Sequence, residues 1–247
     1  MSASVQIRKT LETSWRLTKA SKLAIWIPSI IAIMISLIVT QLIHTIFKVP
    51  DGDTLPTWIQ FFLQPIIANF LSAPFFAGAI MVGIKCLRGE KIEPFTGLKY
   101  IRPFLPVAIS FAVMSLIMRI PTLLSLHHSN WVVFIADVLT AIIFIFLVFA
   151  IPLITDKQRM PVQAFIESIK LAGKQWHKIF IVFFCLYLIG VIITIPLGLG
   201  IHFNNNILNI IGIIIMVLCL VWLLPWVFLC MSTIYERLTT LNDTANK

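Results

Sequence analysis

Residues 207–234 read ILNIIGIIIMVLCLVWLLPWVFLCMSTI and contain no charged side chain. A helix rises about 1.5 Å per residue, so this run is longer than the roughly 20 residues that cross the hydrocarbon core of a bilayer. Lipid offers the backbone no hydrogen-bond partner, and the run shows no period-2 alternation, so it is predicted to be a helix. The stretch therefore indicates an α-helical membrane protein.

Further apolar runs of similar length precede this one, at about residues 23–47, 58–84, 103–126, 131–153 and 179–199. The run at 103–126 is the weakest, because it reaches full length only by including Arg119. The six runs and their connections use nearly all of the 247 residues. The prediction is an all-α, polytopic protein with six transmembrane helices in a single integral membrane domain over residues 1–247.

The composition excludes an ordinary soluble domain. Hydrophobic residues make up 59% of the chain and charged residues only 12%, against about 25% charged residues in soluble proteins. The net charge of +9 does not indicate nucleic acid, because the basic residues flank apolar segments instead of forming one stripe. No catalytic motif, phosphate-binding loop or metal-ligand spacing is present, so we expect a protein that is not an enzyme and has no metal or cofactor.

The basic residues predict the orientation in the membrane. All 19 Lys and Arg except Lys48 and Arg119 fall in the N-terminal segment, the 85–102 and 154–178 connections or the C-terminal tail. Positive residues are retained on the cytoplasmic side. Both termini are therefore expected in the cytoplasm, with anionic lipid headgroups as the counter-charge.

The chain offers a basic, amphipathic segment followed by two spans three times, in units of about 1–84, 85–153 and 154–247. The clearest segment is 161–178, where one face is apolar and the other is polar or basic. Its apolar face is predicted to contain Val162, Phe165, Ile166, Ile169, Ala172 and Trp176. A local sequence match between the first and third units supports the repeat. At identical spacing, the matched residues are Ser14, Arg16, Leu17 and Ile25 in the first unit and Ser168, Lys170, Leu171 and Ile179 in the third.

Such segments are expected to lie flat at the membrane interface, with their basic residues facing headgroups. The residues concerned are Arg16, Lys19, Lys170, Lys174 and Lys178. Two interpretations remain open. The segments cap the bundle and fix its topology, or they form a surface that senses lipid or docks a partner.

Five polar residues within the spans are candidates for a further role. Arg119 and Asp137 each lie nine positions from the expected apex of a hairpin near residue 128, so they are predicted at similar depth. They would form a structural lock or a proton, ion or substrate site. Gln60 and Gln64 are one turn apart and, with Asn69, are favoured as interhelical hydrogen-bond partners over the lining of a cavity.

Two stretches carry a resemblance to a known family. The sequence PLITDKQRMPVQAFIES at 152–168, with Trp176 following, and the segment 78–95 with Arg88-Gly89-Glu90 resemble uncharacterised YciC-like six-span proteins of bacterial inner membranes. A similar membrane domain is fused to some glycerophosphodiester phosphodiesterases, but this chain has no hydrolase domain. The resemblance implies a multi-pass location in the bacterial inner membrane and no particular activity.

The function expected from these features is that of a non-enzymatic accessory or lipid-interacting factor in envelope maintenance. Its expected partners are anionic phospholipids, with a homo-oligomer or another membrane protein as further possibilities. The alternative is a small secondary transporter or channel that uses Arg119 and Asp137.

Overall fold

The computed structural model describes residues 6–47, 56, 58–125, 130–202 and 206–245. Within these residues the secondary structure is helical and contains no strand. In chain order the elements are α1 (Ile7–Ile46), the π-helical turn η1 (Ile59–Leu63), α2 (Gln64–Leu87), the 3-10 turn η2 (Thr96–Ile101), α3 (Phe104–Ser125), α4 (Asn130–Leu147), α5 (Ala150–Lys157), α6 (Pro161–Gly173), α7 (Trp176–His202) and α8 (Asn206–Ala245).

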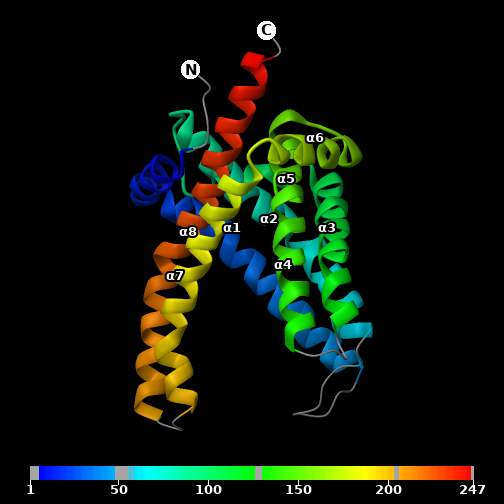
Figure 1. The fold of residues 1–247 in the computed structure, drawn as a ribbon, viewed down its shortest axis with the longest axis vertical. Helices are drawn as coiled ribbons and strands as arrows, with labels where there is room; N and C mark the ends of the chain where they lie inside the picture. The colour runs from blue at the N-terminus through cyan, green and yellow to red at the C-terminus, as the bar shows by residue number, and fades with distance from the viewer. Residues whose placement is uncertain (1–5, 48–55, 57, 126–129, 203–205, 246–247) are drawn as a thin grey trace.

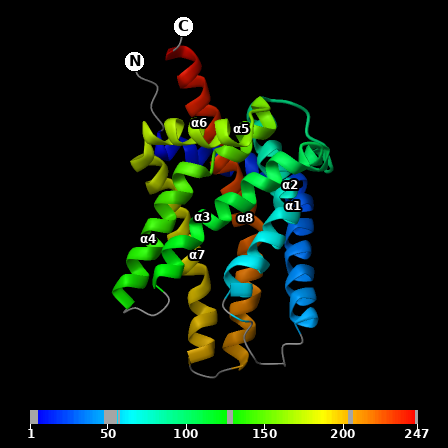
Figure 2. The same cartoon turned by 90° about the vertical axis from the view of Figure 1, so that its right-hand side faces the viewer.

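The structure confirms the six spans. Six helical segments in the described residues are long and apolar enough to cross a membrane. They are α1, α2, α3, α4 continued by α5, α7 and α8. α1 begins and α8 ends at the same end of the molecule, near α5 and α6 (Figure 1). We call this end the basic end, because η2, α6 and the first turns of α1, with their Lys and Arg residues, lie there (Figure 2).

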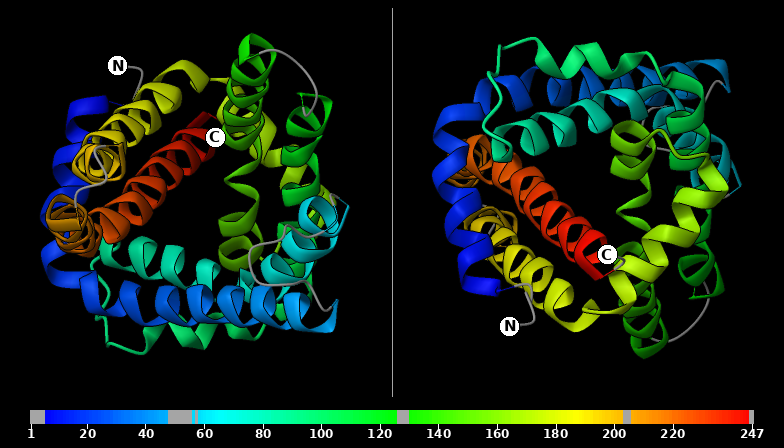
Figure 3. Two further views of the ribbon diagram at one scale, coloured as in Figure 1. Left: turned by 90° about the horizontal axis from the view of Figure 1, so that it is seen from below. Right: turned by 90° about the horizontal axis from the view of Figure 1, so that it is seen from above.

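α1 combines the N-terminal amphipathic segment and the first span in one helix of 40 residues. Its ribbon bends between the two parts (Figures 2 and 3). Pro28 lies inside this helix, and a proline there removes one backbone hydrogen bond and permits such a bend. The amphipathic part can therefore cross the basic end while the rest of α1 runs along the bundle.

The first part of α1 packs on α8 through a stripe of small hydroxyl side chains as well as through apolar residues. Thr10, Ser14, Thr18 and Ser21 are buried at helical spacing, and the Ser14 and Thr233 hydroxyls lie 2.9 Å apart. Small residues of this kind allow helix backbones to approach closely. Trp15 lies outside this stripe, where its ring packs against Trp226.

Each unit of the predicted repeat places its leading segment on the second span of the preceding unit. η2 contacts α2 where Gly97 meets Gly78, and Ser168 of α6 donates to the Phe146 carbonyl of α4 at 2.6 Å. Ser14 of α1 closes the cycle on α8. The three pairs of spans thereby surround one axis, as the views along the long axis show (Figure 3).

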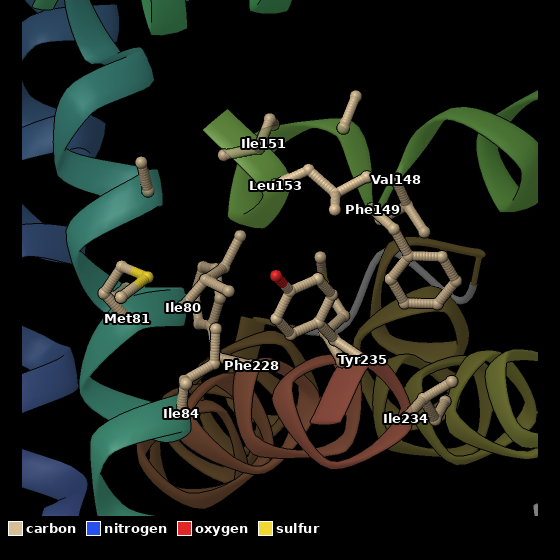
Figure 4. Packing of buried hydrophobic residues seen from close by; sticks show 14 of the residues in the cluster. Ile80, Met81, Ile84, Val148, Phe149, Ile151, Leu153, Phe228, Ile234 and Tyr235 are labelled. Atoms are coloured by element: carbon tan, nitrogen blue, oxygen red, sulfur yellow. The ribbon is translucent and has the colours of Figure 1, made fainter. Parts of the chain in front are cut away.

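The core lies toward the basic end, where α2, α4–α5 and α8 converge (Figure 4). Phe149 and Tyr235 are its largest fully buried side chains, and their rings stack with centroids 6.5 Å apart. Ile84 of α2 and Leu153 of α5 are also fully buried. Farther from this end, α7 and α8 stand apart from α3 and α4 (Figure 1) and expose many apolar side chains.

Candidate functional site

A charged cluster joins three spans at the basic end. Arg88 Nη1 and Nη2 each donate to one carboxylate oxygen of Asp156 at 2.8 Å. Arg88 also donates through Nε and Nη2 to Glu236, at 3.1 and 3.0 Å. The Tyr235 hydroxyl donates to Asp156 Oδ2 at 3.1 Å. We call Arg88, Asp156, Tyr235 and Glu236 the charged clamp.

The local sequence holds Arg88 at the end of α2. Gly89 follows it with φ +73°, and the Glu90 N–H donates to the Lys85 carbonyl at 3.0 Å. A glycine in the left-handed region is the usual way to end a helix with this bond. Arg88 is consequently the C-cap of α2, immediately after Leu87, and its guanidinium reaches both α5 and α8.

The charged side chains of the clamp are partly buried, which strengthens the interactions between them. The Asp156 side chain is 11% exposed, whereas those of Arg88 and Glu236 are 35% and 29% exposed. The pKa of Arg88 is raised well above its usual value, first by its hydrogen bonds to Asp156 and then by those to Glu236. Bidentate guanidinium–carboxylate contacts are directional as well as strong. The clamp therefore fixes the relative positions of α2, α5 and α8.

The helix α6 contacts the protein mainly through small residues and leaves part of its predicted apolar face exposed. Ala164, Ser168, Leu171 and Ala172 are the buried residues, and of these only Ala172 belongs to the predicted apolar face. Val162, Ile166 and Ile169 are exposed, because small side chains are what permit close packing on the neighbouring helix ends. We call these three residues the apolar stripe of α6.

The basic residues chosen from the sequence lie at the same end as the clamp. Arg16, Lys19, Lys170 and Lys174 are exposed, and Lys178 is half-buried. Lys170 and Lys174 belong to α6 and its C-cap, and α6 lies across the ends of α3 and α4 (Figure 1). Exposed cations and an exposed apolar stripe thus occur on one short helix.

The structure does not bring Arg119 and Asp137 together. The Thr140 hydroxyl lies 3.3 Å from the Met118 carbonyl, so the register of α3 and α4 places the two charged residues at similar depth as predicted. Arg119 is half-buried, but Asp137 is exposed on α4. Among the described residues no ion pair includes Asp137.

This geometry predicts a small effect for Asp137→Asn. Losing one member of a buried ion pair costs about 3–5 kcal/mol, whereas Asp137 has no ion pair to another described residue that the substitution could break. We therefore expect thermal denaturation of the purified chain to show no loss of stability of this size for the variant. A loss of stability of about 3–5 kcal/mol would show that Asp137 does form an interhelical ion pair.

The three amides differ in their surroundings. Gln64 Nε2 donates to the Thr40 hydroxyl at 3.0 Å, which links α2 to α1, and Asn69 Nδ2 donates to the Ser115 hydroxyl at 2.6 Å, which links α2 to α3. Gln60 is exposed. It lies in the π-helical turn η1, one turn before Gln64.

Sequence reasoning missed the clamp. Its partners are 68 and 148 positions apart in the chain, and each looks like an ordinary charge beside an apolar run. One local signal was present, because Arg88 is followed by a glycine that ends a span. Arg88 and Asp156 also belong to the two stretches, 78–95 and 152–168, on which the family resemblance depends, and the clamp brings those stretches together.

Comparison of the chain with known protein families, with curated proteins and with solved structures finds no match. The class of protein consequently rests on the fold. The chain is a multi-pass α-helical membrane protein. Its hydrogen-bonded charges and the helix α6 lie at the basic end.

Proposed function

We propose that this chain is a non-enzymatic protein of the bacterial inner membrane that binds anionic phospholipids at its basic end and supports envelope maintenance as an accessory factor. The basic end faces the cytoplasm in this proposal, as the distribution of Lys and Arg favours. The YciC-like resemblance is the reason for choosing a bacterial inner membrane. The lipid preference is argued from α6.

The apolar stripe of α6 is the observation that carries the proposal. Val162 is 70% exposed, and Ile166 and Ile169 are each nearly half exposed. Exposed aliphatic side chains on a helix at the end of a membrane bundle are stabilised by insertion among acyl chains. Lys170 and Lys174 on the same helix are positioned to meet headgroup phosphates, since both are exposed.

Charge favours anionic over zwitterionic lipid. A cation near the surface of an anionic membrane contributes about 1 kcal/mol of attraction, and this attraction fades within a Debye length. Arg16 and Lys19 of α1 are exposed at the same end as Lys170 and Lys174. Several cations held by rigid helices at one level would add their contributions, and salt would weaken the sum.

Anionic lipid is expected to stabilise the folded chain. A ligand that binds only the folded state raises its stability according to concentration and affinity. Phosphatidylglycerol added to the purified, detergent-solubilised chain should raise the melting temperature more than phosphatidylcholine at equal concentration. Lys170→Gln with Lys174→Gln should reduce this difference, whereas Lys170→Arg with Lys174→Arg keeps both charges and should retain it.

Three results would contradict the proposal. Equal stabilisation by phosphatidylglycerol and phosphatidylcholine would remove its electrostatic basis. Insensitivity of the difference to the glutamine pair would remove α6 from it. Turnover of labelled phospholipid by the purified chain would show an enzyme.

A further inference from the structure

A cavity of about 490 Å³ opens at the basic end between two spans. One wall comes from η2 and the start of α3, and the other from the end of α5 and the residues after it. The cavity is distinct from the charged clamp, because none of the four clamp residues lines it. Its polar lining consists of Lys99, Tyr100, Arg102, Thr155, Gln158 and Arg159.

The lining carries three cations and no acid. Lys99 Nζ lies 3.4 Å from Glu93 Oε2, and Arg159 Nε lies 3.1 Å from Glu167 Oε1. The first pair is well exposed and the second is partly exposed, and exposed pairs of this kind are weak enough for a third charged group to compete with them. The cavity thus favours an anion.

Arg102 is the cation best placed to bind a ligand. It is exposed, and its side chain has no hydrogen bond or ion pair to another described residue. It lies immediately before Pro103 and the first turn of α3, and the N-terminus of a helix carries a partial positive charge. Neutralising Arg102 would therefore remove no interaction that holds the fold together.

The remaining lining suits a headgroup larger than bare phosphate. Hydroxyl groups of Tyr100 and Thr155 and the Gln158 amide can hydrogen-bond phosphate or glycerol oxygens. Pro103, Pro106 and Ile154 add apolar surface. A volume of about 490 Å³ lies in the range of sites for organic ligands. The position at the ends of two spans also gives direct access from the membrane interface.

Gln158 shows local backbone strain in this lining. Its φ is +53° and its ψ +35°, and it is the only described non-glycine residue with positive φ. A side chain other than glycine in this region costs free energy, and such strain is concentrated at functional sites. Glycine would end α5 at this position without that cost.

We propose that this cavity binds the phosphate-bearing headgroup of an anionic phospholipid, with Arg102 as the main phosphate contact and Lys99 and Arg159 as supporting cations. The inference rests on the proposed lipid-binding function and adds a defined site to it. Free phosphate offers the same chemistry as the headgroup. The size of the cavity and its place at the interface favour the lipid.

The test compares two Arg→Gln variants with the same change of charge. Binding of short-chain dihexanoyl phosphatidylglycerol to the purified full chain is measured by calorimetry, with dihexanoyl phosphatidylcholine as the neutral lipid. Arg102→Gln is expected to raise the dissociation constant for the glycerol lipid about tenfold, as loss of one charge-assisted hydrogen bond would. Arg8→Gln, at an exposed site outside the cavity and outside the cations assigned to the proposed lipid surface, should change it less than about twofold.

The outcomes separate this inference from the proposed function. Equal effects of the two variants would overturn the cavity and leave general electrostatic binding standing. If the unaltered chain binds both lipids equally, the site and the proposed function fall together. Inorganic phosphate that binds as tightly as dihexanoyl phosphatidylglycerol would overturn the lipid assignment in favour of a soluble anion.

Gln158→Gly provides a second variant that keeps the fold. Glycine accepts the left-handed backbone without strain, so the melting temperature should stay the same or rise while the cavity loses an amide. Affinity for dihexanoyl phosphatidylglycerol should fall about threefold or more. Unchanged affinity in this variant together with unchanged affinity in Arg102→Gln would overturn the site.

Discussion

Gly78→Ala is expected to lower the free energy of unfolding by about 3 kcal/mol, at the upper end of the cost of overpacking. A Cβ at Gly78 would overlap the carbonyl oxygen of Gly97. That oxygen belongs to backbone and cannot rotate away. η2 cannot retreat either, because the far side of Gly97 lies against Pro28, whose Cγ would be 2.8 Å from a Cβ at Gly97.

Thermal denaturation of the purified chain tests this expectation, with Gly190→Ala as the matched control. A Cβ at Gly190 meets no atom within 4 Å, and alanine is the better helix former by about 1 kcal/mol. The control should therefore melt at the same temperature or higher. Equal melting temperatures for the two variants would mean that α2 and η2 are not in contact at Gly78.

The spans could be predicted because their signal is local. An uncharged run such as 207–234 must form a helix in lipid wherever the rest of the chain lies, and the structure has α8 there. The start of α6 has a local cause too, since Pro161 is its first residue and proline is favoured in the first turn of a helix. No long-range information was needed for these elements.

The faces of the helices could not be predicted in the same way. For α6 the apolar pattern identified Val162, Ile166 and Ile169 as part of the face expected among acyl chains, but it did not indicate that Ala164 and Ser168 would be the residues buried against the protein. In a soluble protein hydrophobicity identifies the core, but at a membrane interface lipid covers apolar side chains equally well. Small residues then determine which face of a helix contacts the protein, and the hydropathy pattern does not identify that face.

For Arg119 and Asp137 the depth in the membrane could be predicted, but not whether the two side chains would meet. Counting from a hairpin apex gives depth, and the Thr140–Met118 contact agrees with it. Direction around each helix depends on how α3 and α4 pack, which residue spacing alone does not contain. The charged clamp could not be predicted from the sequence for a related reason, because its three charged residues come from three different spans.

Asp156→Asn is expected to destabilise the chain by about 2 kcal/mol. Breaking a fully buried ion pair costs about 3–5 kcal/mol, and solvent screening at the partly exposed Arg88 reduces that figure. Asparagine keeps the size of the side chain and can still accept from Tyr235. Its loss of charge leaves Arg88 with Glu236 as its one carboxylate partner among the described residues.

The matched control is Glu90→Gln, which neutralises a carboxylate paired with Lys85 one turn from the clamp. Its side chain is 44% exposed, so the change should cost less than about 1 kcal/mol. Melting temperatures of the two variants and of Arg88→Gln provide the comparison. If Asp156→Asn and Glu90→Gln lowered stability equally, the bidentate contact would add nothing beyond surface charge.

A double variant of Arg88 and Asp156 should be less destabilised than the sum of the single variants, because each single change leaves the partner of the removed charge without its counter-charge.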